Sequence, residues 1–149
     1  MSQSVRFYLL ASTALMAAGS LLHNAVLLGG AEWYAFVGAP LGLIHMLALG
    51  SLRPAVSCIM IASILLICTA FALSAAGVIG RHPAIRPALA IIAVALIARG
   101  LLLPAVAVWA PRLLLGICGR CKELNDFVLL TSALCLFAGG GYAVAALAL

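Results

Sequence analysis

The chain has 149 residues, of which 67% are hydrophobic and only 7% are charged. Soluble domains carry about 25% charged residues, which cover the surface that faces water, so this composition excludes a water-soluble globule and predicts a protein surrounded by the lipid bilayer. The net charge of +5 comes from basic residues that are scattered singly along the chain. Nucleic-acid binders gather such residues on one face to neutralise several phosphates, so we expect no nucleic-acid partner.

Four long apolar runs follow one another along the chain, each near the length of about 20 residues with which a helix crosses a hydrocarbon core of about 30 Å. We expect membrane spans over residues 7–30, 54–80, 87–110 and 126–149. Pro54 suits the first turn of the second span, and Asn125 or Asp126 can cap the fourth. The predicted fold is an all-α, integral-membrane, antiparallel four-helix bundle that forms a single transmembrane domain over residues 1–149.

The first run and its flanks support two further expectations. Arg6 followed by the apolar residues 7–18 resembles a signal peptide, but the apolar character continues through Leu28, so we expect a retained helix. Arg6 and the terminal amine precede this helix and Glu32 follows it, which favours termini in the cytoplasm.

The connections between the predicted spans differ in character. Residues 31–53 contain an apolar stretch, residues 44–49, that is too short to cross a membrane, so we expect an interfacial or re-entrant segment lying on the bundle between the first two helices. Residues 81–86 predict a tight turn. Residues 111–125 carry four charged side chains and predict an aqueous loop.

The aromatic residues fall near the ends of the predicted spans. Trp and Tyr prefer the headgroup level, where an apolar ring and a polar N–H or O–H are both satisfied. The four predicted spans therefore predict two aromatic belts, with Trp33, Tyr34 and Trp109 on one side of the membrane and Tyr8 and Tyr142 on the other.

Arg99 lies near the middle of the third predicted span, where a charged side chain costs at least about 2.5–3.5 kcal/mol on insertion scales. Such a residue usually faces the bundle interior and has a partner there. Pro104 leaves the carbonyl of Gly100 without its helical donor, so a kink beside Arg99 would gather polar groups at membrane depth. Two interpretations stay open: Arg99 binds an anion or a lipid headgroup, or it bonds helix carbonyls and only locks the bundle.

His23 and Asn24 are the next candidates. On the first helix two adjoining stripes consist of small and polar residues, namely Ser12, Met16, Gly19 and His23 in one and Thr13, Ala17, Ser20 and Asn24 in the other. We expect this face to turn inward and to let another backbone approach closely. His23 could relay protons or ligate a metal, and an interhelical hydrogen bond is the simpler interpretation.

Small residues also form a stripe on the fourth helix, where Ser132, Cys135, Gly139 and Tyr142 follow helical spacing. Close backbone packing makes glycine useful in lipid. We interpret this stripe mainly as a packing face.

Cys118 and Cys121 form a CxxC motif in the predicted aqueous loop. Two thiolates could capture a heavy metal, helped by Arg120 and Lys122, which would favour the charged form of the thiols. One pair supplies only two of the four ligands that zinc prefers, and chance spacing in a basic loop is the alternative interpretation.

Catalytic motifs are absent from the sequence. It has no phosphate-binding loop, nucleophile elbow or metalloprotease motif. Glu32, Glu123 and Asp126 are the only carboxylate side chains, so acid–base catalysis by carboxylates has little material to use, and no cofactor is predicted.

The residues after the first helix carry a family resemblance. Glu32-Trp33-Tyr34 followed by residues 36–40 resembles the small four-helix bacterial inner-membrane proteins grouped as DoxX-like, over about residues 7–40 and in the overall four-span plan. The acidic residue that this family carries in its second helix is absent here. The resemblance implies a multi-pass accessory protein of the bacterial inner membrane, sometimes associated with quinone or redox systems.

Three functional classes follow, in this order. The small-residue faces predict a non-enzymatic accessory or scaffold subunit, which would bind a larger membrane protein or copies of itself. The second class is a transporter or binder of a small solute, anion or lipid that uses Arg99, His23 and Asn24, with Gly100 beside them. The third is a thiol-based metal or redox protein that uses Cys118 and Cys121.

Overall fold

The structure, a computed structural model, describes residues 1–80, 83–114, 118–121 and 124–149. Part of the predicted turn at 81–86 and part of the predicted loop at 111–125, including Lys122 and Glu123, lie outside these ranges. Within the described ranges every regular element is a helix, as the all-α prediction requires. Four of these helices are long and apolar enough to cross a membrane, which is the pattern of a multi-pass membrane protein.

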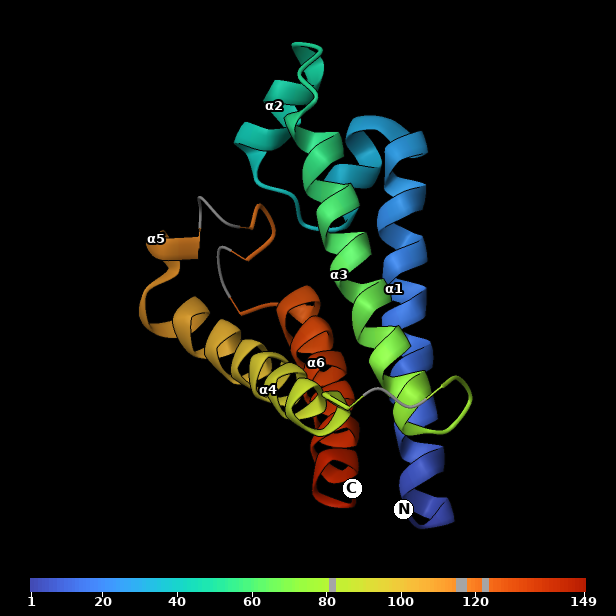
Figure 1. Ribbon diagram of the computed structural model, residues 1–149. Helices are drawn as coiled ribbons and strands as arrows, with labels where there is room; N and C mark the ends of the chain where they lie inside the picture. Colours follow the sequence, from blue (N-terminus) through green and yellow to red (C-terminus); the bar gives the residue numbers. More distant parts are fainter. Residues whose placement is uncertain (81–82, 115–117, 122–123) are drawn as a thin grey trace.

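The helices follow the predicted spans closely but differ at their ends. The four long helices are α1 (Gln3–Phe36), α3 (Arg53–Ala75), α4 (Ile85–Trp109) and α6 (Asp126–Leu147). Two short helices stand between them, α2 (Leu41–Ala48) and α5 (Pro111–Leu114). Both termini lie at one end of the molecule and α2 lies at the opposite end (Figure 1).

Helix α1 is longer than the predicted span 7–30, because it continues through Trp33 and Tyr34 to Phe36. Gly30 interrupts it with φ +67° and ψ −162°. Glycine adopts this backbone conformation readily because it has no Cβ. The predicted end of the first span is therefore a break within α1, and the residues expected to start a connection form its last turns.

Helix α2 corresponds to the apolar stretch that was predicted to be too short to cross a membrane. The structure forms it as an eight-residue helix that contacts α1 and α3. At about 1.5 Å per residue it extends only about 12 Å, well short of a hydrocarbon core.

The long helices associate as two pairs, α1 with α3 and α4 with α6 (Figure 1). Glycines allow the second pair to approach closely: a Cβ on Gly139 would lie 2.8 Å from Ile97 Cγ1, and one on Gly100 would lie 2.7 Å from Leu136 Cγ. Gly141 packs against Ser12 and so joins α6 to α1. The predicted packing face of the fourth helix is therefore confirmed.

Most of the small polar face of α1 turns inward, as predicted, because Ser12, Thr13 and Ser20 are buried. Asn24 belongs to the same predicted face but is exposed, so the prediction is wrong at that position. The hydroxyl of Ser20 donates a hydrogen bond of 2.9 Å to the carbonyl of Ala62 on α3, which ties the two helices together.

Two members of the predicted aromatic belts are buried inside the protein. Tyr34 and Tyr142 are only 2% and 0% exposed, so neither ring faces the surroundings of the helices. The Tyr142 hydroxyl donates instead to the carbonyl of Cys68 at 3.1 Å, inside the helix assembly. A polar group buried by packing finds a protein acceptor in place of water.

Candidate functional site

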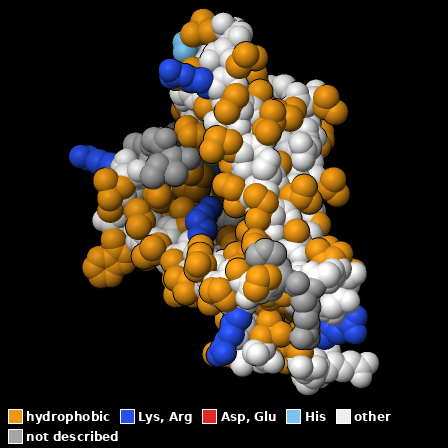
Figure 2. Space-filling view, viewed as in Figure 1, with side chains coloured by type: hydrophobic (Ala, Val, Ile, Leu, Met, Phe, Trp, Pro, Cys, Tyr) orange, Lys and Arg blue, Asp and Glu red, His pale blue; other side chains and the backbone are white. Residues whose placement is uncertain are grey.

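A cavity of about 650 Å³ lies between the two helix pairs, which also contact each other through α1 and α6. Residues of α1, α3, α4 and α6 line it, together with the connection between α1 and α2 and the loop that bears Cys118. Figure 2 shows the hollow on this face, bordered largely by hydrophobic side chains and containing a basic one. Its volume lies within the range of about 300–1,000 Å³ that is typical of small-molecule sites.

The cavity wall is predominantly apolar. Aliphatic and aromatic side chains of three long helices supply most of it, among them Ile61, Leu65, Leu102, Leu103, Val106 and Phe127. Hydroxyl groups of Ser57 and Thr131 and the ring of His23 interrupt this surface. Among the described residues that line the cavity, Arg99 is the one with a formal charge.

The packing of α4 directs Arg99 into this cavity. Arg99 and Gly100 are consecutive, so their side-chain directions differ by about 100° around the helix. Gly100 faces α6, where a Cβ would lie 3.0 Å from the carbonyl oxygen of Ser132. Arg99 is thereby turned from the α4–α6 contact towards the space between the helix pairs, where it lies close enough to Cys135 for its charge to act on that thiol.

The guanidinium of Arg99 makes no hydrogen bond or ion pair with any residue that the structure describes. The second interpretation of Arg99, a lock formed with helix carbonyls, therefore has no contact to support it in the described ranges. The five N–H donors of an arginine side chain need acceptors when they are removed from water.

Pro104, which was predicted to kink the helix beside Arg99, stands inside α4, and α4 continues beyond it to Trp109.

His23 lines the same cavity from the other helix pair. Its Nδ1 lies 2.9 Å from the carbonyl oxygen of Gly19, one turn earlier in α1. Because a carbonyl can only accept, Nδ1 is the donor in this hydrogen bond, which leaves Nε2 as the second ring nitrogen. The expected interhelical hydrogen bond is thus replaced by one within α1.

The other two predicted site residues lie elsewhere. The side-chain amide of Asn24 donates to the carbonyl of Ser20 at 2.9 Å, and Asn24 is not among the residues that line the cavity. Gly100 belongs to the contact between α4 and α6. The structure therefore brings Arg99 and His23 to one cavity and leaves Asn24 and Gly100 outside it.

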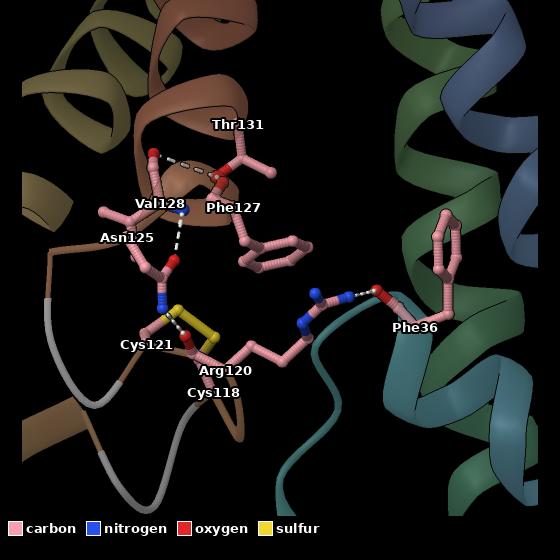
Figure 3. Close-up of a disulfide and its surroundings, with 8 residues drawn as sticks. All are labelled: Phe36, Cys118, Arg120, Cys121, Asn125, Phe127, Val128 and Thr131. Carbon is pink, nitrogen blue, oxygen red and sulfur yellow. Dashed lines mark hydrogen bonds between the residues drawn. A yellow bond between two sulfur atoms is a disulfide. The ribbon is translucent and has the colours of Figure 1, made fainter.

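Cys118 and Cys121 are joined by a disulfide, with a Cα–Cα distance of 5.4 Å (Figure 3). Both residues are buried, and Cys118 lines the cavity. In this oxidised form neither sulfur is a thiolate that could ligate a metal. Within the described ranges no three His, Cys, Asp or Glu side chains lie together as metal ligands.

The disulfide loop is attached to the end of α1 by a group of contacts that we call the clasp, formed by Gly119 and Arg120 of the loop with Phe36 and Gly38. The amide of Gly119 donates to the carbonyl of Gly38 at 3.0 Å, and Arg120 Nη1 donates to the carbonyl of Phe36 at 3.2 Å. The Arg120 guanidinium also lies 4.8 Å from the centroid of the Phe127 ring (Figure 3). The clasp lies at one end of the cavity, because Gly38 and Cys118 both line it.

Gly38 allows the chain to approach Phe127 closely at the clasp. Its φ of +80° is readily adopted only without a side chain, and a Cβ there would lie 2.8 Å from Phe127 Cζ. In the sequence, Gly38 stands out only as part of the family resemblance. Its neighbour across the clasp is 81 positions later in the chain, counting from Gly38 to Gly119, so no local pattern identifies the contact.

Asn125 fixes the beginning of α6 beside the loop. Its Oδ1 accepts a hydrogen bond of 3.0 Å from the amide of Val128, which confirms Asn125 as the N-cap. Its Nδ2 donates to the carbonyl of Arg120 at 2.8 Å. One side chain therefore links the first turn of α6 to the clasp.

Comparisons of the chain with protein-family models, with curated proteins and with solved structures give no match. A functional proposal for this chain therefore depends on the chemistry of the cavity. The combination to be explained is a basic group that has no partner among the described residues, is itself exposed, and lines a predominantly apolar cavity.

Proposed function

We propose that this chain is a membrane-embedded antiparallel four-helix protein that binds an anionic ligand in the cavity between its helix pairs, with Arg99 as the counter-charge. The observation that carries the proposal is that Arg99 lines the cavity without a hydrogen bond or ion pair to a described residue. An arginine at membrane depth costs at least about 2.5–3.5 kcal/mol on insertion scales. A carboxylate or phosphate bound to its fork would offset that cost through short, charge-assisted hydrogen bonds.

His23 supports the same function. Its Nδ1 is engaged by the carbonyl of Gly19, so the orientation of the ring is fixed within α1. The remaining ring nitrogen accepts a hydrogen bond in the neutral form and donates one in the charged form. A ligand with an acidic group can therefore be contacted from α1 as well as from α4.

An accessory subunit was the first functional class that the sequence favoured, because of its small-residue faces. Gly139 and Gly141 use these faces for contacts within the chain, with Ile97 and Ser12. They therefore do not themselves favour a partner protein. For this reason we place ligand binding before assembly with a larger membrane protein or with further copies of the chain.

The location in a bacterial inner membrane, with cytoplasmic termini, belongs to this proposal, as does the DoxX-like resemblance. Disulfides persist in oxidising compartments and are rare in the cytosol. The Cys118–Cys121 disulfide lies in the connection between α4 and α6, away from the end that bears both termini (Figure 1). This separation supports termini on the reducing side and the disulfide on the other.

Ligand-dependent thermal stability in detergent tests the proposal. Hexadecanoate is the probe, and Arg99→Gln is compared with Arg112→Gln, which removes an exposed arginine that does not line the cavity. A ligand at 100 times its Kd stabilises the folded state by about 2.7 kcal/mol, so the melting temperature of the wild type and of Arg112→Gln should rise. A similar rise in Arg99→Gln would overturn the proposal.

A further inference from the structure

The cavity opens sideways, through the outer surface between α3 and α4. Ile61 of α3 and Leu102 of α4 both line the cavity, yet they are 42% and 60% exposed. A side chain that is part of a cavity wall and of the outer surface marks an opening. The two helices contact each other less than each contacts its own partner, which leaves room for this opening.

The opening lies at membrane depth. Ile61 stands eight residues after the first residue of α3, which corresponds to about 12 Å along a helix that is long and apolar enough to cross a bilayer. The two side chains that mark the opening, Ile61 and Leu102, are also apolar. Acyl chains therefore have direct access to the cavity through this side.

The single positive charge at the cavity matches a ligand that carries a single negative charge. Arg99 is the one formally charged residue among the described residues of the lining. A monoanion leaves the pair neutral beside an apolar cavity wall, whereas a dianion would leave one negative charge without a partner there. This favours a carboxylate over a fully ionised phosphate monoester.

The volume of the cavity limits the size of the apolar part of the ligand. At about 30 Å³ for each water-sized group, the cavity of about 650 Å³ holds roughly 20 such groups. A sixteen-carbon carboxylate has close to this number of non-hydrogen atoms, and a phospholipid with two such chains has more than twice as many. This volume therefore has room for one acyl chain, but not for both chains of such a phospholipid at once.

We propose that the ligand is a long-chain monocarboxylate that reaches Arg99 from the bilayer, through the opening between Ile61 and Leu102. This inference rests on the proposed anion site and names its ligand class and its route. The carboxylate pairs with the Arg99 guanidinium, and the acyl chain lies against the apolar wall formed by α3, α4 and α6.

A series of ligands with one chain length tests the chemical class. Purified wild type in nanodiscs is titrated with hexadecanoate, hexadecanol and hexadecyl phosphate, and separately with acetate. We expect hexadecanoate to bind about thirtyfold or more tightly than hexadecanol, hexadecyl phosphate to bind more weakly than hexadecanoate, and acetate to fail to compete. Equal binding of hexadecanoate and hexadecanol, stronger binding of the phosphate, or competition by acetate would overturn the inference.

Two tryptophan variants test the route. Leu102→Trp narrows the opening, and Leu101→Trp is its matched control, because Leu101 is 59% exposed on the same helix but does not line the cavity. A photoreactive fatty acid in the nanodisc should label wild type and Leu101→Trp equally and Leu102→Trp about tenfold less. Equal labelling of all three variants would contradict the lateral route.

The failure of this inference and the failure of the proposed function are distinguishable. If Arg99→Gln abolishes binding of an anion but acetate competes with hexadecanoate, the anion site stands and the long-chain ligand is wrong. If Arg99→Gln binds hexadecanoate as the wild type does, the site itself is wrong.

Discussion

Arg120 Nη1 donates a hydrogen bond of 3.2 Å to the carbonyl of Phe36, and so connects the disulfide loop to the end of α1 across 84 residues of sequence. The same guanidinium lies over the ring of Phe127, the second residue of α6 (Figure 3). One side chain thus joins the two helix pairs at the end of the cavity that is farthest from the termini. This contact lies beside the cavity, whose lining residues Ile61 and Leu102 are exposed on the side between α3 and α4.

Removal of the Arg120 side chain should weaken this connection. Arg120→Ala loses the hydrogen bond to Phe36 and the contact with Phe127, and because Arg120 is exposed we expect a cost of about 1 kcal/mol or less. Arg112→Ala removes another exposed arginine and should leave the melting temperature unchanged. Equal melting temperatures for the two variants, measured in the same detergent, would show that the clasp does not stabilise the fold.

The disulfide predicts a specific pattern of thiol labelling. The chain has five cysteines, of which Cys58, Cys68 and Cys135 are free. Mass spectrometry of unfolded, unreduced protein should therefore detect three alkylated thiols, and reduction should add two more. Five labelled thiols before reduction would mean that the loop is not oxidised, which would also remove the support for placing it outside the cytosol.

Gly100 should be sensitive to the addition of a single methyl group. Gly100→Ala places a Cβ 2.7 Å from Leu136 Cγ and 3.0 Å from the Ser132 carbonyl oxygen, so α4 and α6 must separate. Overpacking of this kind costs about 1–3 kcal/mol, and we expect a lower melting temperature.

Gly42→Ala is the control for this prediction. Gly42 lies in the helix α2, and a Cβ there would meet no atom within 4 Å. Alanine favours a helix over glycine by up to about 1 kcal/mol, so this variant should be unchanged or slightly more stable. A Gly100→Ala variant as stable as Gly42→Ala would contradict the packing of α4 on α6.

The N-cap of α6 gives an independent test. Asn125→Ala removes the acceptor for the Val128 amide and the donor to the Arg120 carbonyl, with an expected cost of about 1–2 kcal/mol. Asn125→Asp keeps the cap acceptor and loses only the second contact. Thermal unfolding should therefore rank wild type above Asn125→Asp and Asn125→Asp above Asn125→Ala.

The lengths of the apolar runs located the long helices, because such a run consists of residues that are neighbours in the sequence. The four runs predicted the four long helices, and Asn125 could be proposed as a cap from its position before an apolar run. Hydropathy could not locate the break in α1, because Gly30 is as compatible with the end of a helix as with an interruption inside one.

The site depended on contacts that local patterns do not contain. Arg99 stood out because a charge is costly within an apolar run. The sequence prediction grouped it with His23, on a different helix 76 residues earlier, but no local pattern showed that these two side chains, and not Asn24, line one cavity. The burial of Tyr142 was not predicted for a similar reason, since the acceptor of its hydroxyl is the carbonyl of Cys68 on another helix. Asn24 and Gly100 are next to His23 and Arg99 in the sequence, but they do not line the cavity. Asn24 donates to the carbonyl of Ser20, and Gly100 packs against α6.

The most direct test of the central claim is an experimental structure of the protein in lipid nanodiscs, at a resolution that shows what lies beside the Arg99 guanidinium. We expect elongated density that passes between Ile61 and Leu102 and ends in an acidic group about 2.7–2.9 Å from the guanidinium nitrogens. Pairing of Arg99 with a carboxylate of the protein itself, or an Arg99 side chain turned out of the cavity, would contradict the account.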